Sequence, residues 1–88
     1  FRDGVQTGGN SSAPADAAAA ALAARGVVVR AWGKAPLARV AAAAVVGVDP
    51  AHMGIGPAPA IRLLLERAGL QLADVARFEI NEAQGAQT

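Results

Sequence analysis

The chain has 88 residues, with 8 Lys and Arg against 7 Asp and Glu, so its length and charge allow at most one small domain. A net charge of +1 argues against nucleic acid or an anionic membrane as the main partner. With no Cys and one His, the chain has no thiolate nucleophile and no His cluster, and we predict no metal site. Of the hydrophobic residues 24 are Ala, which buries little area, so we expect low independent stability.

The longest uncharged apolar stretch, residues 40–48, is half as long as a bilayer span, and no signal segment opens the chain. We therefore predict no membrane segment and, for the protein, a cytoplasmic location. The first residue is Phe and the only Met is Met53, so we expect the start of the protein to be missing.

The first half of the chain gives weak structural signals. Residues 1–16 are rich in Gly, Asn, Ser and Pro, which predicts a polar loop. Residues 17–24 favour a helix by propensity, but the β-branched run 27–29 suits a strand, so local rules leave 17–32 open. The small and apolar run 37–48 fits a strand that is buried on both faces, with a buried helix as the alternative.

The second half is clearer. The apolar spacing within PAIRLLLERAGL predicts a helix over about 58–68, with Pro57 and Pro59 in its first turn and Gly69 at its end. A short turn, QLAD, follows, and the alternation in ARFEIN predicts a strand over 77–80. The fold class is therefore α/β, with a βαβ unit at about 37–81 whose two strands are parallel.

Three segments carry residues that could serve a ligand. The glycines of MGIGP precede the predicted helix, but Pro59 rules out a dinucleotide fingerprint, and a tight turn is the simpler interpretation. Asn81 and Glu82 follow a strand at the edge where α/β sheets bind ligands, although Asn there is more often a cap. The polar run 10–12 offers hydroxyl and amide groups, and His52 is interpreted as a solvated loop residue.

Together, six stretches in this order resemble a thiolase: TGGNSS with Asp16, PLARV, GVDP, MGIGPAPAIR, LERAGL and FEINEA. The resemblance implies a layered α/β/α/β/α fold of two similar halves. Residues 1–34 would end the N-terminal half and include a coenzyme A-contacting loop, and 35–88 would start the C-terminal half. It also implies a strand at 17–24 and a helix at 25–32.

The resemblance further implies an acyltransferase of fatty acid metabolism that condenses 3-ketoacyl-CoA thioesters or cleaves them by thiolysis. Its substrate would be a coenzyme A thioester, with no covalently bound cofactor and no metal, and the parent enzyme would be a homodimer or homotetramer. Ser12 matches a serine that contacts the pantetheine arm, and Met53 matches a methionine that lines the pocket near the thioester. Asn81 matches the asparagine that holds the oxyanion-hole water.

The chain also departs from the thiolase pattern. Gln84 and Gly85 follow NEA where thiolases usually have Phe and Ala, so an amide replaces an aromatic wall of the pocket. The acylated cysteine of the family lies upstream of this region, and its histidine and second cysteine lie downstream. We therefore expect an internal fragment that is inactive alone. The alternatives are a non-catalytic thiolase-like acyl or lipid carrier and a degenerate coding fragment.

Overall fold

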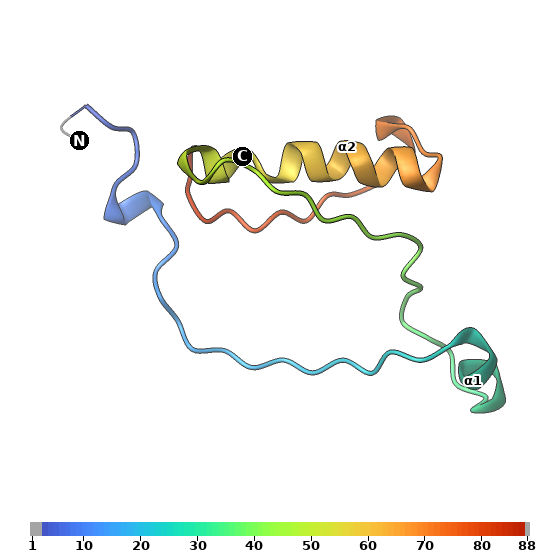
Figure 1. Ribbon diagram of the computed structural model, residues 1–88. Coiled ribbons are helices and arrows are strands. Elements are labelled where there is room, and N and C mark those ends of the chain that lie inside the picture. The colour runs from blue at the N-terminus through green and yellow to red at the C-terminus, as the bar shows by residue number, and fades with distance from the viewer. Residues whose placement is uncertain (1–2, 88) are drawn as a thin grey trace.

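The longest element in the computed structural model, which describes residues 3–87, is helix α2 (Pro57–Ala68; Figure 1). Pro57 and Pro59 lie in its first turn, where backbone N–H groups have no partner within the helix and a proline costs nothing. Ile61, Leu64 and Leu65 lie on one side of the helix and are half-buried. The helix predicted over about 58–68 is therefore confirmed, with one additional residue at its start.

The end of α2 is fixed by Gly69, which adopts the left-handed conformation (φ 65°, ψ 32°). The Gly69 N–H donates to the Glu66 carbonyl at 3.2 Å, and the Leu70 N–H donates to the Leu65 carbonyl at 3.0 Å. This pair of bonds is the Schellman arrangement, which satisfies carbonyls that the last helical turn leaves free. The predicted turn follows as the 3₁₀ helix η3 (Leu72–Asp74).

Helix α1 (Gly26–Ala31) falls within the helix that the thiolase resemblance implies at 25–32. It forms despite the β-branched run 27–29, and the Trp32 N–H donates to the Val28 carbonyl at 3.0 Å to close its last turn. The strand implied at 17–24 is not formed: this segment has neither helix nor strand, and all of its residues are exposed. An alanine-rich segment without a neighbouring strand has no backbone partner that would hold it in a sheet.

The predicted βαβ unit is present only in its helix, because residues 3–87 contain no strand. No backbone hydrogen bond joins residues 37–48 to 77–80 within that range, and a strand exists only as part of a bonded ladder. One backbone carbonyl of residues 37–48 is bound by a side chain instead, because Arg67 Nη1 donates to Ala43 O at 3.2 Å. The one β feature described in 3–87 is an isolated antiparallel bridge between Ser11 and Gln84.

The segment before α2 nevertheless keeps the two-residue periodicity of a strand. Ala42, Ala44, Val46 and Val48 are half-buried, and the residues between them are exposed, with Val45 at 89%. Ala44 lies with Ile61 and Leu64 of α2 around one hollow, so the half-buried side faces that helix. The other side of the segment has no cover within residues 3–87.

The elements do not enclose a shared core: none of residues 3–87 is fully buried. The accessible surface is 8164 Å², whereas a compact protein of 8.7 kDa exposes about 4,700 Å². The radius of gyration is 17.6 Å, against about 12 Å for a compact chain of this length. Figure 1 shows the cause, since residues 13–24 cross open space far from α2. No helix in 3–87 is long and apolar enough to span a membrane.

Candidate functional site

The polar loop that precedes Ser12 is folded by its own side chains around the 3₁₀ helix η1 (Gly8–Asn10). The Thr7 hydroxyl accepts from the Gly9 N–H at 3.2 Å, and Asn10 Oδ1 accepts from the Thr7 N–H at 2.6 Å. The Ser11 hydroxyl donates back to the Thr7 carbonyl at 2.8 Å. These bonds fix the loop internally, so its next residue, Ser12, can turn to a distant part of the chain.

Ser12 binds the segment that carries the NEA motif, 70 residues further along the chain. Its hydroxyl donates to the Glu82 carbonyl at 2.9 Å, and its N–H donates to the Ala83 carbonyl at 2.9 Å. The Gly85 N–H donates in the opposite direction, to the Asn10 carbonyl at 2.7 Å. We call residues 10–12 and 82–85 the clasp. The clasp joins two of the three segments in which the sequence predicts site residues.

Asn81 lies directly before the clasp and is exposed. Its carbonyl accepts from the Ala83 N–H at 3.1 Å, and the same N–H also donates to Gln87 Oε1 at 2.9 Å. Asn81 borders a hollow of about 470 Å³ between α2 and residues 75–81, which we call the α2 hollow. The walls of this hollow are mostly apolar, and Arg77, Glu79 and Asn81 are the polar residues that border it.

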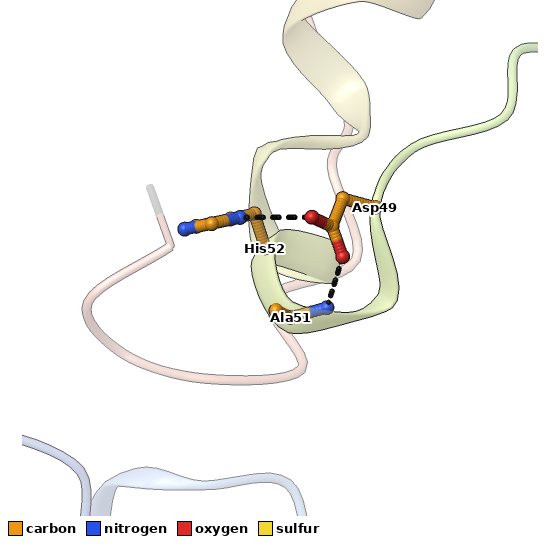
Figure 2. Close-up of polar contacts among 3 residues, drawn as sticks. All are labelled: Asp49, Ala51 and His52. Carbon is orange, nitrogen blue, oxygen red and sulfur yellow. Dashed lines mark hydrogen bonds and ion pairs between the residues drawn. The ribbon is translucent and has the colours of Figure 1, made fainter.

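Met53 is presented by the 3₁₀ helix η2 (Pro50–Ile55). Asp49 begins this helix, because its Oδ1 accepts from the Ala51 N–H at 2.9 Å, and Pro50 fills the first helical position (Figure 2). Met53 is 61% exposed and borders a second hollow of about 610 Å³, the η2 hollow, together with Gln84 of the clasp. Met53 and Asn81 therefore border different hollows.

His52 has an acidic neighbour that the sequence interpretation missed. Its Nδ1 lies 3.7 Å from Oδ2 of Asp49, and Figure 2 shows the carboxylate between this imidazole and the Ala51 N–H. The signal was the spacing of three residues in the stretch DPAH, which a helical turn converts into a contact. Both side chains are exposed, at 76% and 68%, which agrees with a solvated loop histidine.

Two glutamines at the η2 hollow were also missed as site residues. Gln6 borders the hollow, and its side-chain Nε2 and Oε1 are buried without a hydrogen-bond partner in residues 3–87. Gln87 borders it as well and fixes the Ala83 N–H. Repeated glutamine after NEA was the signal for Gln87, whereas nothing in the sequence singles out Gln6. Gln84, which the sequence predicts in the wall of a pocket, lies in the same hollow as Met53.

Comparison with known proteins gives one family and several relatives. The family described as "Thiolase, C-terminal domain" matches residues 34–88. The chain is 52% identical over 86 residues to a 3-ketoacyl-CoA thiolase of Erwinia tasmaniensis, and 49% identical over 86 residues to one of Yersinia pestis. A 3-ketoacyl-CoA thiolase of Pectobacterium carotovorum is 50% identical over the same length. Each alignment covers 98% of this chain but 22% of the relative.

Proposed function

Since the chain belongs to the thiolase family, we propose that it forms part of an acyltransferase that condenses or thiolytically cleaves 3-ketoacyl-CoA thioesters. The observation that carries the proposal is the clasp. It brings the loop of Ser12, where the resemblance implies a coenzyme A contact, against the segment of Asn81, where it implies the oxyanion hole. Two segments 70 residues apart are thereby held as one unit, as a site that binds a single thioester requires.

Asn81 would orient a water toward the thioester oxygen. Asn81 is exposed at the edge of a mostly apolar hollow, and a hydrogen-bond donor fixed there would stabilise negative charge that develops on the thioester oxygen. The chain supplies no cysteine, and its one histidine borders the η2 hollow and not the α2 hollow that Asn81 borders. The nucleophile and the general base would therefore come from other parts of the enzyme.

Ser12 would bind the pantetheine arm as a hydrogen-bond acceptor. A serine hydroxyl has one donor and two acceptor positions, and the donor is used by the Glu82 carbonyl. What remains is an acceptor, which fits an amide N–H of the pantetheine arm and does not fit one of its carbonyls. Met53, which is largely exposed at the η2 hollow, would line the acyl pocket together with Gln84.

In the assembled fold, residues 1–34 would end the N-terminal half and 35–88 would start the C-terminal half. Residues 37–48 and 77–80 would then become strands of the thiolase sheets and complete the βαβ unit. Two observations support this: the alternating burial of residues 41–48, and backbone groups in both segments that have no partner within 3–87. The substrate would be a coenzyme A thioester in a soluble cytoplasmic enzyme, a homodimer or homotetramer without metal.

The test is thiolysis by the complete protein that contains this chain. With acetoacetyl-CoA and free coenzyme A, we expect turnover that tracks the protein peak through repurification. A complete protein that binds acyl-CoA but shows no turnover would overturn the proposal and would instead support the carrier alternative.

A further inference from the structure

We propose that Ser12 is a positioning residue that sets the orientation of Asn81 through the backbone of residues 82 and 83, an inference that rests on the function proposed above. Ser12 binds two consecutive carbonyls, those of Glu82 and Ala83, each at 2.9 Å. A single residue that holds two adjacent peptide groups fixes both the position and the rotation of that stretch of chain, which one hydrogen bond cannot do.

The restraint passes directly to Asn81. The Glu82 carbonyl that accepts from the Ser12 hydroxyl belongs to the same peptide group as the Ala83 N–H, which donates to Asn81 O at 3.1 Å. Gln87 holds the same N–H through its Oε1 at 2.9 Å. Residues 81–83 are therefore held by hydrogen bonds from Ser12 to two carbonyls and by the hydrogen bond from the Ala83 N–H to Gln87. Asn81 is exposed, so this backbone, and not packing around the side chain, fixes the point from which the amide extends.

Gly85 makes the remaining hydrogen bond of the clasp, to Asn10. Its N–H approaches the Asn10 carbonyl to 2.7 Å, and a Cβ at Gly85 would lie 3.2 Å from that oxygen and 3.4 Å from the Asn10 Cβ. A side chain here would force the two segments apart by a few tenths of an ångström. Glycine at position 85 thus permits the short contact, which is one further point of attachment beside the two bonds of Ser12.

Disulfide formation in the complete protein tests whether the clasp exists in solution, and peptide mapping can assign the new bond because these 88 residues contain no other cysteine. Ser11 and Gln84 face each other across the antiparallel bridge, which brings their Cα atoms within disulfide range. We expect the double variant Ser11→Cys with Gln84→Cys to form its disulfide at least about tenfold faster than the control, Ser11→Cys with Gln71→Cys, under mild oxidation. Gln71 lies after the C-terminal end of α2, whereas Gln84 lies near η2, which precedes the N-terminal end of that helix. Equal rates for the two pairs would overturn the clasp.

Steady-state kinetics of the complete thiolase then test the role of Ser12. We expect Ser12→Ala to lower kcat about three- to tenfold, as loss of one hydroxyl–carbonyl bond allows, and Ser12→Thr, which keeps the hydroxyl, to restore it. Asp74→Ala is the control, because it also removes one side-chain hydrogen bond to the backbone, that from the Gln71 N–H, but lies outside the clasp. In an Asn81→Ala background, Ser12→Ala should lower kcat by less than about twofold, because the residue through which it acts is gone.

The outcomes separate the two proposals. A rise in KM for coenzyme A with unchanged kcat, or a loss of kcat that is undiminished in the Asn81→Ala background, would overturn the positioning role and leave the proposed function standing. Absence of any turnover by the complete parent protein would overturn the proposed function, whereas an Asn81→Ala variant with full kcat would overturn the oxyanion role of Asn81 and with it the positioning role of Ser12. Fast disulfide formation would establish the clasp in either case. If Ser12→Ala fails to fold, Ser12→Cys gives the same comparison with a weaker donor in place of the hydroxyl, and full kcat in that variant would count against the positioning role.

Discussion

The 88-residue chain should unfold in urea without a sharp transition, because it buries too little surface. Unfolded, a chain of 8.7 kDa exposes about 12,600 Å², so unfolding from the present 8164 Å² would expose about 4,400 Å² more. A compact protein of this mass would expose about 7,900 Å² more. Since the urea m-value scales with exposed surface, we expect a slope of about half that of a compact domain of equal length.

The assay is far-ultraviolet circular dichroism across a urea gradient, with sedimentation to establish that the species is monomeric. We expect a shallow, gradual loss of helical signal that starts at the lowest urea concentrations, since none of residues 3–87 is fully buried. A sigmoidal two-state curve with the slope of a compact domain would refute the reasoning, because it would require a core that these residues do not form.

Three further predictions follow from individual features. The purified 88-residue chain should show no thiolysis of acetoacetyl-CoA above a buffer blank, since it lacks a cysteine nucleophile, and activity that copurifies with the chain would contradict this. Gly69→Ala should cost about 1–2 kcal/mol in the free energy of unfolding of the complete protein, because Ala resists the left-handed conformation. Gly8→Ala is the control, because Gly8 has no left-handed conformation and no atom within 4 Å of an added Cβ, and equal melting of the two variants would be the contrary result. In the complete enzyme, Met53→Ala should raise KM more for long acyl chains than for acetoacetyl-CoA; a uniform change would place Met53 outside the acyl pocket.

Local signals in the sequence were sufficient where the chain folds on itself. Helix α2 is specified by its apolar stripe, by proline at its start and by Gly69 at its end, and all three act within a few residues of each other. The same is true of the QLAD turn, which Asp74 closes by accepting from the Gln71 N–H at 2.8 Å. Features of this kind could be predicted without any knowledge of distant neighbours.

Strands could not be predicted reliably because their hydrogen bonds are made with segments far away. Residues 37–48 have the composition of a buried strand, yet no strand pairs with them within 3–87. For α1 the β-branched run 27–29 pointed to a strand, and only the family resemblance implied a helix there. The element that formed therefore contradicted the local preference of its residues.

In the candidate site, too, local contacts could be predicted from the sequence and contacts between distant segments could not. Ser12 and Asn81 were singled out by resemblance to family motifs, but their connection depends on a hydrogen bond across 70 residues that no local pattern encodes. The pairing of His52 with Asp49 could have been read from spacing alone. Gln6 could not, because its burial at the η2 hollow arises from segments distant in sequence.

The most direct test of the central claim is the turnover number of Asn81→Ala in the complete thiolase. If the Asn81 amide orients the oxyanion-hole water, its loss should lower kcat by about 10² to 10³, or about 2.7 to 4 kcal/mol, with a much smaller change in KM. Turnover of Asn81→Ala within about threefold of the parent, less than about 1 kcal/mol, would contradict the claim that this chain contributes the oxyanion donor of a thiolase.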